Sequence, residues 1–432
     1  MRAVVRLALA SVLLSIAAMA QQAIDPARAA QYFAEAKDAS DRDASAVWGV
    51  RLYGPMMFAD ARSRTVVANQ ADTEGMLKHE GDVWTGTLPP NVGIANTATK
   101  WGGVHWTMIM WGALGRFRQD RVRLMMHECF HRAQDGIGLP ATDAVNNHLD
   151  TMDGRVWLQL EWRALDRALR SSGVARKKAL ADALAFREHR RRLIASAAKA
   201  ESALERNEGL AEFTGVKIAA ATPAERAEMA EIDLRQAYQR ATFVRSFAYI
   251  SGPAYGLLLD AARARWQRAV KGSFDLGELV RQAYALSKSA PKDGDVLARA
   301  KNYDGEEIIA LEKRRDEKRQ RELAEARKKF VGGPVLVVKP GEHFSYGFDP
   351  NNVVAVDENS TVYPSLNVSD DWGELKVEGG AMLVREKGMI TRLVLPAPAA
   401  GATKGDGWEM NLKPGWEIVP SERQGDATLA KK

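Results

Sequence analysis

The chain has 432 residues, of which 46% are apolar and 27% are charged. This composition is typical of globular proteins and excludes collagen-like, intrinsically disordered and purely coiled-coil classes. The 61 Lys and Arg residues exceed the 55 Asp and Glu residues by only six charges, which is too few to predict a nucleic-acid partner. Two or three domains are expected, because single hydrophobic cores rarely grow beyond about 300 residues.

The first 20 residues have the order of a secretory signal peptide. Arg2 and Arg6 are followed by an apolar run, residues 7–17, and then by small residues up to Ala20. A transmembrane anchor is the alternative, but the run is shorter than the roughly 20 residues needed to cross a bilayer. We therefore expect cleavage after Ala20, a periplasmic or secreted mature protein, and no stable membrane insertion. An uncleaved signal would instead tether the protein to a membrane.

The texture of the remaining sequence changes twice. Residues 21–112 begin with a short helical pattern over residues 25–37 and continue with alternating runs between turn signals, which predicts mostly strands. From 113 to 330 apolar residues recur three and four apart, which predicts helices. Residues 331–420 are expected to form a small all-β domain, followed by a polar tail over 421–432. The predicted fold class is α+β.

Two charge-rich segments lie in the helical region, at residues 187–192 and 312–329. Runs of this kind usually mark helix surface in contact with water, and both are interpreted in that way. The chain has one cysteine, Cys129, which excludes an intramolecular disulfide.

The strongest chemical signal is the sequence His-Glu-Cys-Phe-His at residues 127–131, inside a predicted helix that begins near Asp120. At 3.6 residues per turn, His127 and His131 project about 40° apart and can bind one cation. Glu128 then lies beside the metal as a base for a bound water. Zinc suits this chemistry because it lowers the pKa of that water to about 7. A chance match with two core histidines is the alternative.

The opposite face of this helix carries Cys129, about 200° from His127. A side chain turned away from the proposed metal has no part in binding it, and we expect Cys129 to be a small buried apolar residue.

A catalytic zinc needs a third protein ligand and an open position for water. Glu201, Glu205, Glu208 and Glu212 recur at spacings of four, three and four residues, so a regular helix would place them in one stripe. Such a stripe needs cations or a metal beside it, or else is a solvated acidic face. The spacing alone does not choose among the four glutamates.

The pattern H-E-x-x-H at 127–131, followed by N-E-x-x-A-E at 207–212, resembles the gluzincin metallopeptidases. Their third zinc ligand is a glutamate in an E-x-x-A-acid pattern on a second helix. The resemblance implies a zincin-like catalytic domain with Glu208 as the third zinc ligand. It also implies that Glu212, one turn later, orients a ligand histidine.

The segment Tyr249-Ile-Ser-Gly252 is distantly similar to the Y-x-x-G helix start of aminopeptidase N-like and glycyl-aminopeptidase-like gluzincins. In those enzymes the tyrosine donates to the oxyanion of the tetrahedral intermediate, which implies this role for Tyr249. Tyr255 is the alternative donor, and either residue could instead be a half-buried tyrosine at a helix end.

The sequence departs from the aminopeptidase pattern in two places. The gap between His131 and Glu208 is much longer, so extra helices must lie between the ligands. The G-x-M-E-N motif that binds the substrate amine is missing from the upstream strand at residues 103–108, which favours an endopeptidase-like cleft. In gluzincins, an edge strand just before the zinc helix binds the substrate backbone by β-augmentation. The resemblance implies such an edge strand upstream of residues 127–131.

We therefore predict an exported zinc metallopeptidase that hydrolyses peptide bonds in a peptide or protein. His127, His131 and Glu208 hold Zn²⁺, Glu128 is the general base, and Tyr249 stabilises the oxyanion. The rival hypothesis is a catalytically inactive, zinc-stabilised binding protein of the cell envelope. No motif indicates the substrate, the oligomeric state or the role of the carboxyl-terminal β domain.

Overall fold

The computed structural model describes residues 23–432 except 143, 195, 263–265, 272–274, 288–291 and 349–352. The expected signal peptide lies outside the described residues. The chain combines a helical core with β-sheets, so the mixed α and β class expected from the sequence is confirmed. Contacts divide the described residues into two units, one within residues 23–46 and 51–132 and the other within residues 47–50 and 133–432. None of the helices in the described part is both long and apolar enough to cross a membrane.

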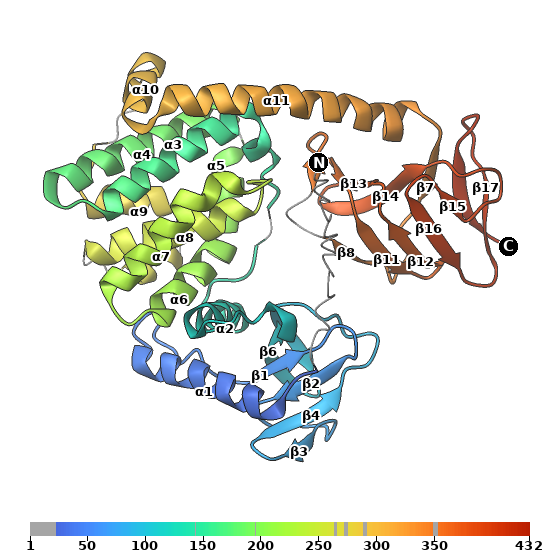
Figure 1. Ribbon diagram of the computed structural model, residues 1–432, viewed down its shortest axis with the longest axis horizontal. Coiled ribbons are helices and arrows are strands. Elements are labelled where there is room, and N and C mark those ends of the chain that lie inside the picture. The colour runs from blue at the N-terminus through green and yellow to red at the C-terminus, as the bar shows by residue number, and fades with distance from the viewer. Residues whose placement is uncertain are drawn as a thin grey trace, which may run out of the picture. The chain divides into compact units, whose positions relative to one another are not determined.

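The first unit packs two helices on a six-stranded sheet (Figure 1). Its helices are α1 (Pro26–Asp43) and α2 (Arg118–Ala133), with a short 3₁₀ turn η1 (Trp111–Ala113) before α2. The strands are β1 (Met56–Ala59), β2 (Thr65–Ala68), β3 (Lys78–Glu80), β4 (Val83–Thr87), β5 (Thr97–Trp101) and β6 (Val104–Met110). They are ordered β3-β4-β2-β1-β6-β5, and only β1 and β6 pair in parallel.

Contacts on both sides fix the orientation of α2 within this unit. Arg121 forms a buried two-pronged ion pair with Glu35 of α1, at 2.7 Å from Nη2 to Oε1 and 3.0 Å from Nε to Oε2. Cys129 is fully buried against β6, where Thr107 Oγ1 lies 3.7 Å from its Sγ. The expectation that Cys129 is a small buried residue is therefore confirmed.

The second unit begins with a group of helices (Figure 1). They are α3 (Met152–Leu169), α4 (Gly173–Leu193), α5 (Ala197–Leu204), α6 (Leu210–Ala219), α7 (Pro223–Gln236), α8 (Ser246–Ala261), α9 (Leu276–Ala283), α10 (Asp293–Ala300) and α11 (Gly305–Arg327). Two π-helical turns interrupt the pattern, η3 (Glu205–Gly209) and η7 (Lys328–Gly332). Short 3₁₀ turns are η2 (Asn147–Asp150), η4 (Ala237–Gln239), η5 (Trp266–Lys271) and η6 (Lys301–Tyr303).

Local sequence explains several of these helix starts. Thr151 caps α3 by accepting a hydrogen bond from the Gly154 N–H at 3.1 Å. Before α7, Thr222 and Glu225 form a reciprocal capping box, and Pro223 occupies the first helical position, where its missing N–H costs nothing.

The interpretation of the two charge-rich segments is wrong for the first and holds for most of the second. The side chains of Arg187 and Arg190 in α4 are only 2% and 1% exposed, because both are paired with carboxylates inside the helical core. Most of residues 312–329 is exposed or half-buried. Glu312 is an exception, since it is buried in an ion pair with Arg155 at 2.9 Å.

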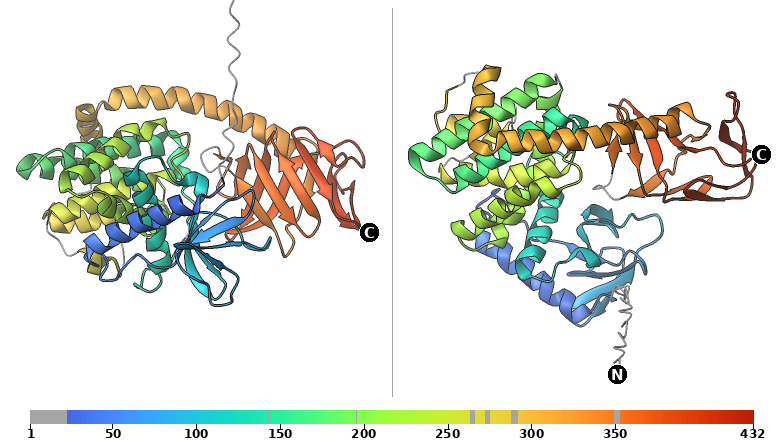
Figure 2. Two further views of the ribbon diagram at one scale, coloured as in Figure 1. Left: turned by 60° about the horizontal axis from the view of Figure 1, so that its bottom comes forward. Right: turned by 45° about the horizontal axis from the view of Figure 1, so that its top comes forward.

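The β region is a sandwich of two sheets (Figure 2). A seven-stranded sheet is ordered β17-β18-β7-β14-β13-β10-β9 and a five-stranded sheet β15-β16-β12-β11-β8. The strands are β7 (Val335–Val338), β8 (Ser345–Phe348), β9 (Val354–Ala355), β10 (Ser360–Tyr363), β11 (Leu366–Asp370), β12 (Gly373–Val377), β13 (Ala381–Glu386), β14 (Met389–Pro396), β15 (Lys404–Gly405), β16 (Trp408–Leu412), β17 (Trp416–Pro420) and β18 (Ala427–Lys431).

Buried and exposed residues alternate in β11, β12 and β16 of the five-stranded sheet, whereas β7, β10 and β13 of the seven-stranded sheet are buried at consecutive positions. In β11, Leu366 and Val368 point into the core while Asn367 is exposed, as a period of two residues requires. The inner faces of both sheets, together with Trp372 and Trp408, form one apolar cluster. The region therefore has the all-β character expected from its short runs.

The expected polar tail at residues 421–432 is wrong. This segment contains β18, which pairs antiparallel with β17 and parallel with β7. Ala427 is buried and Leu429 packs on the core between the sheets. The short run Ala-Thr-Leu-Ala at residues 427–430, between charged residues, was too weak a pattern to indicate a strand.

Deleting residues 421–432 should destabilise the β region. Without β18, β7 loses one of its two neighbours and part of the core is uncovered, so we expect the melting temperature to fall by about 4 °C or more. Thermal denaturation followed by near-ultraviolet circular dichroism measures this. The control is Lys432→Ala, which removes only an exposed ion pair with Glu417 and should leave the melting temperature unchanged. Equal melting temperatures for the truncated and intact chains would contradict the placement of β18.

Candidate metal centre

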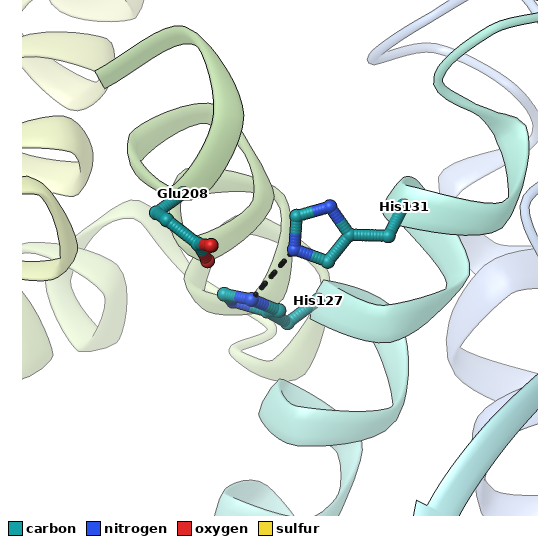
Figure 3. A group of neighbouring side chains, drawn as sticks. All are labelled: His127, His131 and Glu208. Carbon is teal, nitrogen blue, oxygen red and sulfur yellow. Dashed lines mark hydrogen bonds between the residues drawn. The ribbon is translucent and has the colours of Figure 1, made fainter. Parts of the chain in front are cut away.

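Helix α2 presents two histidines one turn apart. The Nε2 atoms of His127 and His131 are 3.1 Å apart, and the ring centroids are 4.9 Å apart (Figure 3). Two imidazole nitrogens bound to one tetrahedral zinc at 2.0–2.1 Å would lie about 3.4 Å apart. His127 and the adjacent Glu128 are buried, and His131 is half-buried. The pair therefore has a spacing that suits a shared cation.

In the second unit, Glu208 lies in the π turn η3 and is held by three donors. The Tyr249 hydroxyl donates to its Oε2 at 2.6 Å. Arg245 Nη2 and Asn207 Nδ2 both donate to its Oε1 at 3.2 Å. Gln134, just beyond α2, donates to Asn207 Oδ1 at 3.1 Å. These bonds fix the direction of a carboxylate that is 7% exposed.

His127, His131 and Glu208 come together as one group of possible metal ligands. One ligand atom from each lies within 4.8 Å of those of the other two (Figure 3). Within the described part of the chain, these three residues form a group of side chains that could hold a metal ion. Of the four glutamates that the sequence left open, Glu208 is the one in this group of possible ligands.

The prediction that four glutamates form one stripe is wrong, and so is the alternative of a solvated acidic face. Glu201 and Glu205 are completely buried and bind arginines of α4 rather than facing the site of Glu208. Arg190 donates to Glu201 through Nε and Nη2, each at 2.9 Å. The π turn holds one residue more than an α-turn, which rotates Glu208 and Glu212 by roughly 100° relative to the preceding glutamates.

The buried charge of Glu201 is compensated by arginines of α4. Burial alone would raise the pKa of Glu201, but Arg190 and Arg191 hold it well below its ordinary value. His148 contributes a further contact, with Nε2 2.9 Å from Glu201 Oε1. The arginines thus keep a carboxylate ionised at a place where water does not reach.

A close contact between glycines joins the second and third motifs. A Cβ atom on Gly252 of α8 would lie 2.3 Å from the carbonyl oxygen of Gly209 and 2.4 Å from its Cα. Gly252, three residues after Tyr249, is therefore required because the backbone of the π turn lies directly against α8. The contact places Tyr249 on the same side of α8 as Glu208.

Tyr249 and Tyr255 occupy different surroundings. Tyr249 lies in the first turn of α8, half-buried, with its hydroxyl on Glu208. Tyr255 is fully buried and donates to Glu161 Oε1 at 2.7 Å. Burial, together with the nearby Glu161 carboxylate, raises the pKa of Tyr255 well above its ordinary value. Tyr255 is therefore a core residue, and the suggestion that it is the alternative oxyanion donor is wrong.

The strand before α2 is not an edge strand, contrary to the expectation. β6 pairs with β1 over residues 107–110 on one side and with β5 over residues 104–108 on the other, so it lies inside the sheet. The edge of the sheet on this side is β5, Thr97–Trp101. An extended substrate added to this side of the sheet would have to pair with β5.

The role of Arg245 as a donor to Glu208 was not predicted from the sequence. Arg245 stands four residues before Tyr249, a spacing that puts both on one helix face and could have been noticed. The buried pairing of Arg187 with Glu205 had no local signal. Glu212 is buried as well, one turn after Glu208.

Comparisons with protein-family models, with curated proteins and with solved structures found no match for this chain.

The substitution Gly252→Ala should destabilise the protein. Its added methyl group would meet backbone atoms that cannot turn aside, so we expect a loss of about 1–3 kcal/mol and a lower melting temperature. The matched control is Gly294→Ala in α10, where a Cβ meets nothing within 4 Å. That change should leave the melting temperature unchanged or slightly higher. A neutral Gly252→Ala would contradict the close approach of the two glycines.

Proposed function

We propose that this chain is a zinc metallopeptidase of gluzincin type. The observation that carries the proposal is the convergence of His127, His131 and Glu208, with Glu128 next to the first histidine. Two imidazoles and one carboxylate form a donor set used by catalytic zinc sites, whereas structural sites are usually rich in cysteine. The donor chemistry therefore fits Zn²⁺, and three protein ligands leave a fourth position for water.

A zinc ion held there would supply a water with a pKa near 7 and would polarise the scissile carbonyl. In the proposed reaction Glu128 takes the proton of the attacking water and passes it to the leaving amine. Of its neighbours in sequence, His127 is a proposed ligand and Cys129 packs against β6, so α2 carries the proposed base on a buried helix.

Tyr249 is the proposed donor to the oxyanion. Its hydroxyl lies 2.6 Å from a carboxylate oxygen of Glu208, so the phenol stands beside the third ligand, where a substrate carbonyl would have to approach. A phenol is a neutral donor that can be directed at developing negative charge. Arg245 and Asn207 would still donate to Glu208 while the Tyr249 hydroxyl donates to the oxyanion of the substrate.

The proposal includes export and a peptide substrate. The expected cleavage after Ala20 would give a periplasmic or secreted protein, and the mass of the mature chain tests this directly. The absence of the amine-binding motif G-x-M-E-N upstream of α2 supports cleavage within peptides over removal of the first residue.

Metal content is the decisive measurement. We expect one zinc per chain in the purified protein, lost or greatly weakened in Glu208→Ala. Glu128→Gln should retain the zinc and lose peptide hydrolysis by about 10²-fold or more, because the base is removed and the ligands are not. Elemental analysis and a peptide-library assay measure the two quantities. Zinc binding without hydrolysis, with a chelator lowering only the melting temperature, would favour the zinc-stabilised binding protein.

Tyr249→Phe separates the proposed oxyanion role from support of Glu208. If the hydroxyl donates to the oxyanion, kcat should fall by about 10²–10³-fold while KM and zinc content stay close to wild type. Steady-state kinetics with a cleaved library peptide, together with zinc analysis, measure this. Loss of zinc at unchanged kcat per bound metal would show that Tyr249 only supports the ligand.

A further inference from the structure

The residue proposed as third ligand lies in an irregular turn. η3, Glu205–Gly209, is a π turn between α5 and α6, and the N–H of Leu210 donates to the carbonyl oxygen of Glu205. Such wide turns are rare and persist only where their surroundings hold them. The direction of Glu208 therefore depends on whatever keeps this turn open.

An ion-pair network holds the beginning of the turn. Arg187 donates through Nη1 to Glu205 Oε1 at 2.9 Å, and its Nη2 contacts Oε2 of the same carboxylate. The two-pronged geometry fixes the orientation of Glu205 as well as its position. Arg187 is itself fixed by Glu161 of α3, at 3.1 Å from Nη1 to Oε1. Arg190 binds the other oxygen of Glu161 at 2.6 Å.

The end of the turn is held by packing. Gly209 lies against Gly252 so closely that neither backbone can move toward the other. The turn is thus fixed at its first residue by charge and at its last residue by contact with α8. Glu208 stands between these two fixed points.

We propose that Arg187, acting through Glu205, is a positioning residue that aims the Glu208 carboxylate. This inference rests on the proposed function, since the aim of Glu208 matters because Glu208 binds metal. Arg187 touches neither the proposed metal nor substrate. Its effect passes along one connected path, from the guanidinium to the first residue of the π turn and then to the ligand three residues later.

The chain offers a matched control for this path. Glu201 lies one helical turn before Glu205, is equally buried, and is also bound by arginines of α4. It precedes the π turn and does not form part of it. Glu201→Gln and Glu205→Gln therefore each remove one carboxylate from the same network. Glu201 also contacts His148, and only Glu205 belongs to the π turn.

The experiment compares these two variants with the wild type in the full chain. Both should lower the melting temperature, because both weaken buried ion pairs. Only Glu205→Gln should weaken zinc binding, by about 10–100-fold, and change the visible absorption spectrum of the Co²⁺-loaded protein. Only this variant should also speed amide hydrogen exchange over residues 206–210, measured without metal.

A second pair covers the case in which a glutamine variant fails to fold. Arg187→Lys keeps the charge and loses the two-pronged contact with Glu205, whereas Arg190→Lys makes the same change on a residue that binds Glu161 and Glu201. The spectral and exchange changes should again be confined to the first variant of the pair.

The outcomes separate this inference from the proposed function. A wild type that binds zinc, with equal effects of the two variants or none on spectrum and exchange, overturns the positioning role and leaves the proposed function intact. A wild type that binds no zinc overturns the proposed function. In that case, amide hydrogen exchange over residues 206–210 that is faster only in Glu205→Gln and Arg187→Lys still supports the view that Arg187 holds the π turn. Equal exchange rates in all four variants overturn that view.

Discussion

The helical core depends on the pairing of the α4 arginines with buried glutamates. Arg187 and Arg190 both bind Glu161 of α3, and each also binds one glutamate of the segment that leads to the proposed metal ligand. Removing one partner from such a set leaves a buried charge without compensation, which costs far more than a surface ion pair is worth. These pairs therefore bind α3, α4 and α5 to one another through charge as well as through apolar packing.

Two kinds of constraint meet at the proposed ligands. The histidines come from a helix that is anchored by its own unit, through Arg121 on one side and Cys129 on the other. The glutamate comes from a π turn whose shape is set by its neighbours. A regular helix supplies a fixed spacing from its own geometry, but an irregular turn needs partners to hold it. On the glutamate side, donors from Tyr249, Arg245 and Asn207 hold the carboxylate itself.

The features that could be predicted from the sequence are those with short-range patterns. The histidine pair follows from a spacing of four residues on a helix, and the β sandwich from short runs such as residues 334–338 and 381–384 between turn signals. The burial of Arg187 could not be predicted, because its partner Glu161 is 26 residues away and nothing local distinguishes it from a surface arginine. The π turn was also invisible, because its sequence reads as ordinary helix. The last strand, β18, was not predicted because its apolar pattern is too short.

The pairing of β7 with β18 has a consequence for how the sandwich forms. β7 is the first strand of the region and β18 the last, about 90 residues apart in sequence, and β7 lies between β14 and β18 in the sheet. Both neighbours of the first strand are therefore made late, and contacts between distant segments form slowly because a long loop must close first. During synthesis, β7 has to wait with both edges open, as a place where a chaperone or a second unfinished chain could bind before its own strands arrive.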